Sequence, residues 1–481
     1  MQKWQLIFER TLFILVLVML VFIPLYPKLP LFNVANTFVA IRLEDFLIAA
    51  ITFVWIGYLL LSQTLKVILQ SRINRLLFLF WGIGALSLFS GIFLTHTTLP
   101  HLGLLHYLRR IEFMILLPIA VTAIKNLHQV KISLITLAVV VFLVNIYALG
   151  QQYLGWPVIS TGNSEFSKGL ILYLTPGARV NSTFAGHYDL AIFLSLVLVA
   201  AVPLFFVVNK YWKVLLVFLS ILSFYILVLT AARQAFVATL MGAIVGLWLI
   251  KKRIIILLML IIASLTLIYP SQLRDRFIST ITINIQKGGD RYVPENNTKN
   301  NSQFNIPTLQ LATPVPTKNR VVQEATKSAT QDEYIASDIA PGEPTDTTQL
   351  GVYRSLGIRV NYEWPAAIRA FTKNPLIGTG YASLGLATDN DVLRSLGEVG
   401  LLGTVAFILL LIEIIRTIRT NINSVGRLIR FFKVGVIAMI LAFILNAMFI
   451  DAFEASKVAV LFWIIIGIAL ATQKKDFNHT A

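Results

Sequence analysis

Arginine residues stand near the ends of several apolar stretches, on the side of a membrane that we expect to face outward. Arg109 and Arg110 stand beside Glu112, where an internal ion pair and a ligand site are equally open interpretations. Arg179 lies in a polar loop, and Arg233 lies in a turn between two strongly apolar stretches. Arginine suits phosphate groups because its planar guanidinium donates paired hydrogen bonds and stays charged. We therefore predict that these arginines bind an anionic substrate, with structural or solvated roles as the alternative.

Acidic residues form a second candidate group near the start of an apolar stretch in the last quarter of the chain. Asp389 and Asp391 flank Asn390, and Glu398 follows inside the stretch. A carboxylate at a shielded surface gains basicity and suits the task of a general base toward a hydroxyl group. The alternatives are helix capping by either aspartate and, for Glu398, an ion pair with Arg394. We predict Asp389, Asp391 and Glu398 as candidate catalytic residues.

A basic amphipathic helix is predicted over residues 354–373, just ahead of these carboxylates. At 100° per residue its apolar side chains fall within an arc of about 120°, opposite its basic side chains. Its apolar face suits a membrane surface and its guanidinium groups suit phosphates, although packing on a helix bundle explains the pattern equally well. The apolar face contains Leu356, Val360, Trp364, Ala367, Ile368 and Phe371; the basic face contains Arg354, Arg359, Arg369 and Lys373, of which the arginines are candidate substrate-binding residues.

The overall composition places these elements in a lipid bilayer. Of the 481 residues, 57% are hydrophobic and only 13% are charged, which is far more apolar than a soluble domain. The formal net charge is +17, and basic residues orient membrane helices and bind anionic lipid groups. The chain contains no cysteine, which excludes disulfides, thiolate metal sites and a cysteine nucleophile. We therefore predict an all-α integral membrane protein.

About twelve apolar stretches approach the length needed to cross roughly 30 Å of hydrocarbon. If the N-terminus is cytoplasmic, every short connection on the inner side is basic, as the positive-inside rule requires. We expect a multi-pass protein of the cell inner or plasma membrane with about twelve transmembrane helices and both termini in the cytoplasm. The predicted spans are 11–26, 44–62, 76–94, 110–124, 132–150, 185–208, 214–230, 234–250, 254–270, 396–415, 434–450 and 458–473.

These spans divide the chain into three parts. Residues 1–270 hold the first nine helices, residues 271–395 form a large outer loop, and residues 396–481 hold the last three helices and a cytoplasmic tail. Within the loop, 284–350 is rich in Asn, Thr, Pro and Gln. Because such a stretch buries too little apolar surface to offset its ordering entropy, we expect it to be disordered.

The order of the short motifs resembles the O-antigen ligase and O-antigen polymerase superfamily. Residues 179–184 and the turn at 230–235 look like that family's arginine motifs, and the turn at 374–381 and the passage at 396–403 complete the likeness. The resemblance implies a GT-C-like bundle with a large periplasmic loop between helices nine and ten. It also implies a glycosyltransferase that takes a glycan from an undecaprenyl-diphosphate carrier, without a nucleotide or metal cofactor.

The resemblance further implies roles for individual residues. Arg179 and Arg233 would bind the carrier's diphosphate and stabilise the charge that grows on it as it leaves. Ligases of the family commonly place a catalytic histidine where this chain has Asp389, Asn390 and Asp391. Either Asp389 serves as the base in its place, or the chain has different chemistry or none. The partners expected are the lipid-linked glycan donor, a glycan, lipid or protein acceptor, and membrane lipids, with ligase and polymerase activity both open.

Two other classes of function compete with glycan transfer. A transporter or flippase of lipid-linked glycans is the first, although such proteins usually contain related halves and this sequence has no obvious internal repeat. A non-catalytic family member is the second, and the absence of the family's histidine favours it. The sequence shows no metal-ligand spacing, P-loop or serine-nucleophile elbow. We therefore expect no cofactor and no nucleic-acid partner.

Overall fold

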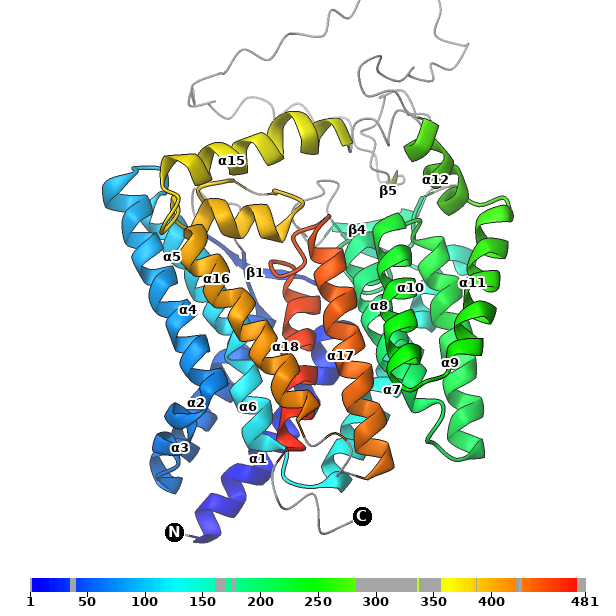
Figure 1. Ribbon diagram of the computed structural model, residues 1–481, viewed down its shortest axis with the longest axis horizontal. Coiled ribbons are helices and arrows are strands. Elements are labelled where there is room, and N and C mark those ends of the chain that lie inside the picture. The colour runs from blue at the N-terminus through cyan, green and yellow to red at the C-terminus, as the bar shows by residue number, and fades with distance from the viewer. Residues whose placement is uncertain are drawn as a thin grey trace, which may run out of the picture.

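The computed structural model describes residues 2–34, 40–160, 170–174, 178–282, 335–336, 356–385, 387–420, 422 and 426–473. Arg354 and nearly all of the segment predicted to be disordered, 284–350, lie outside these residues. The described part of the chain is mostly helical (Figure 1).

Long apolar helices form most of the bundle, because a helix satisfies its backbone groups internally where lipid offers no hydrogen-bond partners. Within the described residues, eight helices are long and apolar enough to cross a membrane. They support the predicted class of helical membrane protein. These helices are α1 (Gln2–Leu25), α2 (Leu43–Ser62), α4 (Arg72–Phe89) with its π-helical extension η1 (Ser90–Leu94), α7 (Leu127–Leu154), α8 (His187–Leu204), α9 (Lys210–Leu229), α16 (Asp391–Arg419) and α17 (Arg427–Ala447).

Other helices occupy the remaining predicted spans in less regular forms. α11 (Arg253–Ile268) and α12 (Gln272–Thr282) meet at a bend of 85° and together make one further candidate span. The predicted span 110–124 is divided between two helices, α5 and α6, instead of forming one. The shorter helices are α3 (Leu65–Gln70), α5 (Pro100–Met114), α6 (Leu116–Ala123), α10 (Arg233–Leu249) and α18 (Ser456–Ala471).

Two small sheets depart from the all-α prediction. β1 (Pro30–Asn33) pairs with β2 (Ala40–Arg42) in an antiparallel manner. β3 (Val158–Ser160) pairs antiparallel with β4 (Leu170–Leu174), which pairs parallel with β5 (Ile335–Ala336). Strands this short carry little periodicity, so the sequence pattern does not reveal them.

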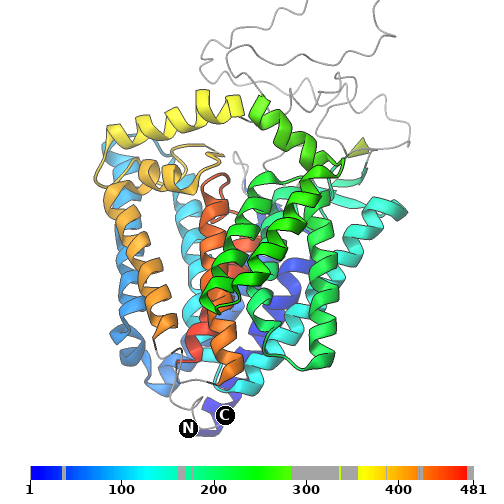
Figure 2. The same cartoon turned by 45° about the vertical axis from the view of Figure 1, so that its right-hand side comes forward.

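The two ends of the bundle differ in character. The start of α1 and the end of α18 lie at the same end, which we call the inner end (Figures 1 and 2). The connections from α8 to α9 and from α16 to α17, which begin or end with basic residues such as Lys210 and Arg427, also lie there. At the opposite, outer end, the π-helical turn η3 (Arg359–Glu363) leads into α15 (Trp364–Lys373), which lies across the top of the bundle.

Small residues let the central helices α8, α10 and α17 approach closely. A Cβ added at Gly435 would lie 2.5 Å from the backbone oxygen of Ala200, and one added at Gly242 would lie 2.8 Å from the Cβ of Ala442. Small residues at helix contacts are typical of membrane bundles, where packing replaces the hydrophobic effect as the main attraction. These contacts fix α8 and α10, whose first residues face the outer end.

A backbone break at Gly400 divides α16 into an outer segment and a long inner segment. Gly400 has φ 67° and ψ −170°, a conformation that is essentially restricted to glycine. The loop after α15 fills the break, because Leu401 N donates to Pro375 O at 2.8 Å and Leu402 N donates to Leu376 O at 3.1 Å. The predicted span 396–415 therefore contains a break that the sequence pattern did not indicate. The outer segment of α16 carries Asp391, Arg394 and Glu398.

Candidate functional site

The two neighbouring arginines of α5 both pair with carboxylates of other elements. Arg109 lies 3.6 Å from Asp45 and donates to the backbone oxygen of Ala40 at 3.3 Å. Arg110 pairs with Glu454 in the α17–α18 loop and donates to the backbone oxygen of Phe453 at 3.3 Å. These contacts favour the internal ion-pair interpretation, with partners other than Glu112. A substrate-binding role for either arginine stays a prediction.

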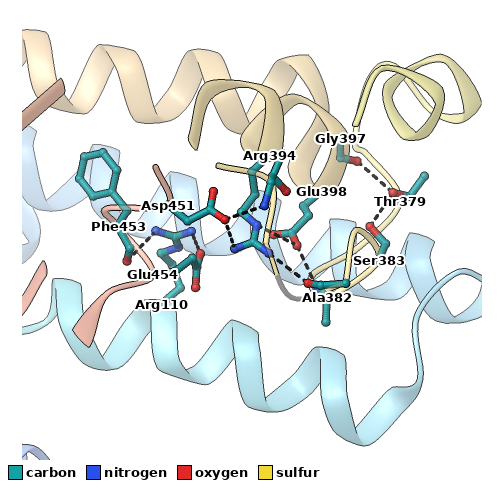
Figure 3. A network of polar contacts seen from close by, with 12 residues as sticks. Arg110, Thr379, Ala382, Ser383, Arg394, Gly397, Glu398, Asp451, Phe453 and Glu454 are labelled. Atoms are coloured by element: carbon teal, nitrogen blue, oxygen red, sulfur yellow. Dashed lines mark hydrogen bonds and ion pairs between the residues drawn. The ribbon is translucent and has the colours of Figure 1, made fainter. Parts of the chain in front are cut away.

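A buried charge network joins the outer segment of α16 to the α17–α18 loop (Figure 3). Arg394 lies 3.3 Å from Asp451 and 3.7 Å from Glu398, and it donates to the backbone oxygen of Gly385 at 3.1 Å. Although burial acts to raise the pKa of Glu454, the positive charges of Arg110 and Arg394 hold it below its usual value. The network therefore keeps Glu454 charged and ties the outer segment of α16 to the loop that contains Gly385 and to the α17–α18 loop.

Two of the three predicted catalytic carboxylates are engaged in this framework. Glu398 is 4% exposed, and its Oε1 accepts a hydrogen bond from the backbone N–H of Ala382 at 3.1 Å as well as the ion pair with Arg394. Asp391 Oδ2 accepts a hydrogen bond from the backbone N–H of Phe453 at 3.0 Å. The cap of α16 is Asn390, whose side chain accepts hydrogen bonds from the first turn. Both carboxylates thus have structural partners on at least one oxygen.

Asp389 is the most accessible of the three predicted carboxylates. Its Oδ2 accepts a hydrogen bond from Arg359 Nε at 2.9 Å and forms an ion pair with Arg359 Nη2 at 2.6 Å. The backbone has φ 49°, which is uncommon for a residue with a side chain, and its N–H donates to Asp451 at 3.2 Å. Burial raises the pKa of Asp389, and although the positive charge of Arg359 lowers it, the negative charge of Asp451 raises it again, so that the pKa stays above its usual value. The Arg359 pair leaves this carboxylate a weaker base than an unpaired one.

Glu363 is a further acidic residue of this region that the sequence analysis did not single out. It is half-buried at the end of η3, and its Oε2 has no hydrogen-bond partner among the described residues. Burial first, and then the negative charge of Asp389, raise the pKa of Glu363 to about 7. The sequence held a signal for it, because Glu363 follows Arg359 by four residues and so shares its helical face.

The predicted basic face of the amphipathic helix is divided in the structure. Arg369 and Ile368 are exposed on α15, whereas Arg359 is only 8% exposed and faces Asp389. The placement of Arg359 on an exposed basic face was therefore wrong. The physical reason for this error is the wider π-helical turn over η3, because the rotation per residue there differs from the 100° that the prediction assumed. Lys373 donates to the backbone oxygen of Thr95 at 2.9 Å and so holds α15 to the bundle.

Four arginines from different elements approach one another at the outer end. Arg233 begins α10 and donates to the backbone oxygen of Arg276 in α12 at 3.3 Å. Arg179 and Arg359 both lie close enough for their positive charges to act on the Arg233 guanidinium. Arg179 contacts His187, the first residue of α8. The structure thus brings together two predicted diphosphate-binding residues, adds Arg276, which the sequence analysis missed, and links them to Asp389 through Arg359.

The loop that carries Arg179 rests on buried contacts. Lys457 is fully buried and its Nζ donates to the backbone oxygens of Thr183 at 2.7 Å and Pro24 at 3.2 Å. Ser182 has φ 52°, and its backbone groups exchange hydrogen bonds with the Gln151 amide at 2.7 and 2.9 Å. This loop is therefore held rigidly from below, and rigid support suits a group that must bind a substrate in one geometry.

Comparisons with known proteins give no relative. No protein-family model matches the chain, and no curated protein matches its sequence. Among the described residues, no group of three or more His, Asp or Glu side chains is arranged to hold a metal ion. The geometry of the outer end is therefore the basis for a functional assignment.

Proposed function

We propose that this protein is a membrane glycosyltransferase that moves a glycan from an undecaprenyl-diphosphate carrier to an acceptor at the outer, periplasmic face. The environment of Arg233 is the observation that carries this proposal. Its guanidinium lies within electrostatic range of Arg179 and Arg359, and the described residues offer it no carboxylate partner. Because like charges repel strongly where water is scarce, such a group is stabilised by an anion of high charge.

A diphosphate on a lipid is the anion that suits this position best. Several guanidinium groups from separate elements can each donate to a different oxygen of a diphosphate, whereas a single phosphate offers fewer acceptors. The arginines lie at the ends of apolar helices, where a lipid carrier would present its head group. A lipid-linked diphosphate has the negative charge that the arginines need and lies at the membrane surface, where they are.

In the proposed topology, this site lies on the periplasmic side of the membrane. All twelve predicted spans cross the bilayer, with the bent α11–α12 pair counted as one and α5 with α6 as another, in a GT-C-like bundle. Both termini and the basic connections then face the cytoplasm, as the positive-inside rule requires. The described helical parts of the outer loop, α12, η3 and α15, lie at that periplasmic end.

The proposed reaction is a displacement at the anomeric carbon of the donor glycan. The acceptor hydroxyl loses its proton to a carboxylate and forms a bond to that carbon, while the bond to the diphosphate breaks and the diphosphate keeps the electron pair. The arginines stabilise the negative charge that develops on the leaving diphosphate. Arg359 links the two halves of the site, since it pairs with Asp389 at 2.6 Å and lies within range of Arg233.

A flippase for lipid-linked glycans is the second candidate, favoured by an apolar cavity inside the bundle. The cavity has a volume of about 410 Å³ and is lined mainly by aliphatic residues of α7, α8 and α9. A lipid chain fits such a lining. Movement of a labelled lipid-linked glycan between leaflets without cleavage of the diphosphate bond would favour the flippase over the transferase.

Transfer in reconstituted liposomes tests the proposal directly. Arg233→Ala and Arg179→Ala should each abolish release of undecaprenyl diphosphate from the glycan-bearing carrier while the protein stays folded. Arg253→Ala is the matched control, because Arg253 also begins an apolar helix, α11, but does so at the inner end. Turnover like that of the unmodified protein in both outer variants would refute the assignment.

A further inference from the structure

Four buried side-chain oxygens near Asp389 have no hydrogen-bond partner among the described residues. They come from three elements: the end of η3, the stretch from the 387–390 loop into the start of α16, and the α17–α18 loop. Leaving such acceptors unpaired costs roughly 1–3 kcal/mol each, so a bound group that donates to them is strongly favoured. The atoms are Glu363 Oε2, Thr388 Oγ1, Asp391 Oδ1 and Asp451 Oδ1.

Existing contacts hold these side chains in one neighbourhood. The backbone N–H of Thr388 donates to Asp451 Oδ2 at 2.7 Å, so the free Oδ1 of Asp451 belongs to a carboxylate that is already oriented. Thr388 is 1% exposed and Asp391 is 8% exposed. Glu363 lies within electrostatic range of both Asp389 and Asp451. The unpaired oxygens of Thr388, Asp391 and Asp451 are thus held in place next to Glu363.

The chemistry of the set points to a ligand with several hydroxyl groups. Three of the four oxygens belong to carboxylates, which accept hydrogen bonds when ionised, and the fourth is a hydroxyl that can accept or donate. The described side chains do not form a group that holds a metal ion. One ammonium group would satisfy acceptors around a single point, whereas a sugar ring presents donors spread over several ångströms.

We propose that Glu363, Thr388, Asp391 and Asp451 form a subsite for the hydroxyl groups of a saccharide acceptor, and that Glu363 takes the proton from the attacking hydroxyl. This inference rests on the proposed glycan transfer and names its acceptor class and its base. Transfer of that proton to Glu363 accompanies bond formation between the hydroxyl oxygen and the anomeric carbon. The diphosphate leaves with the electron pair of the broken bond and stays bound by Arg179 and Arg233.

Glu363 suits this role better than Asp389. A hydrogen bond and an ion pair from Arg359 stabilise the charged form of Asp389, which makes it less ready to accept a proton. Glu363 Oε2 has no such donor, and burial and Asp389 raise the Glu363 pKa to about 7, which matches a base that works near neutral pH. The charged groups acting on Glu363 are Asp389, Arg359, Asp451 and Arg394. Asp389 then serves as a positioning residue that holds Arg359.

The test uses Glu363→Gln in membranes that contain the endogenous donor and acceptor. We measure consumption of the lipid-linked glycan from pH 5.5 to 8.5, and binding of undecaprenyl diphosphate to the purified protein in nanodiscs. The unmodified protein should speed up as pH rises through about 7, the pKa of Glu363. Glu363→Gln should be roughly 100-fold slower or more, because loss of a general base costs that much. Its rate should no longer vary with pH, while its binding of undecaprenyl diphosphate stays within twofold.

Controls separate the possible failures. Glu413→Gln at the inner end of α16, where Glu413 lies 3.5 Å from Arg72, should retain the normal rate and pH profile. Glu363→Asp should recover part of the rate and its rise with pH. A Glu363→Gln protein within threefold of the normal rate, or one that keeps the pH-dependent rise, would overturn the inference. Failure of the unmodified protein to bind undecaprenyl diphosphate or to consume the glycan would instead reject the proposed function itself.

Discussion

Replacement of Gly400 by alanine tests how the outer segment of α16 is positioned. Gly400 has φ 67°, and an added Cβ would lie 2.5 Å from Gly378 N and 2.5 Å from Leu376 O. Both neighbouring atoms are backbone, so neither can move aside without disturbing the loop that fills the break. The residues on the outer segment, Asp391, Arg394 and Glu398, would shift with it.

The cost follows from two separate effects. A side chain forced into this backbone region costs about 1–3 kcal/mol, and overpacking adds about 1–3 kcal/mol. We therefore expect Gly400→Ala to lower the free energy of unfolding by about 3 kcal/mol or more. Gly82→Ala is the matched control, because a Cβ at Gly82 in α4 meets nothing within 4 Å and alanine favours a helix by about 1 kcal/mol.

The assay is reversible unfolding in detergent micelles, followed by tryptophan fluorescence and compared with the unmodified protein. Gly400→Ala should unfold at a lower denaturant concentration, and Gly82→Ala should unfold at the same concentration or a higher one. Equal stability of Gly400→Ala and the unmodified protein would show that the break does not depend on glycine, and the account of the outer segment would then be wrong.

Two further predictions concern the charges of the outer end. Glu363 has a folded-state pKa of about 7 against an ordinary value of 4.5, so the folded protein binds the proton more tightly and stability falls as pH rises through that window. At pH 8, Glu363→Gln should therefore be more stable than the unmodified protein, by about 1 kcal/mol after solvent screening of a half-buried group. At pH 4 the two proteins should be equally stable. Thermal unfolding at both pH values measures this, and equal stability at pH 8 would contradict the prediction. Arg110→Ala should lower the free energy of unfolding by about 3 kcal/mol, because it leaves Glu454 buried without its main partner. Arg110→Lys should lower the free energy of unfolding by less, because it keeps a positive charge. An Arg110→Ala protein as stable as the unmodified one would mean that the pair is not structural.

The course of the helices was largely readable from the sequence. A helix lies at each predicted apolar stretch, because roughly 20 apolar residues in a row have few other stable forms in lipid. The break at Gly400 was not readable, since its backbone conformation is fixed by the 374–381 loop packed into it. The two small sheets were missed because three to five residues carry too little pattern.

The site was only partly readable for the same reason. Arg179 and Arg233 stood out because an arginine beside apolar helices is costly without a purpose. The pairing of Arg110 with Glu454 joins residues 344 positions apart, which no local spacing encodes. Arg359 was placed on the wrong face because a π-helical turn breaks the regular helical step. Glu363 was overlooked because its significance lies in what surrounds it, which only the folded structure supplies.

The central claim is that the protein consumes a polyprenyl-diphosphate-linked glycan at the outer face. Mass spectrometry of lipid-linked glycans in cells that lack the protein tests this claim most directly. We predict that one such glycan accumulates, that the unmodified protein removes the excess, and that Arg233→Ala does not. Unchanged levels of every lipid-linked glycan in the deletion strain, or full restoration by Arg233→Ala, would contradict the account.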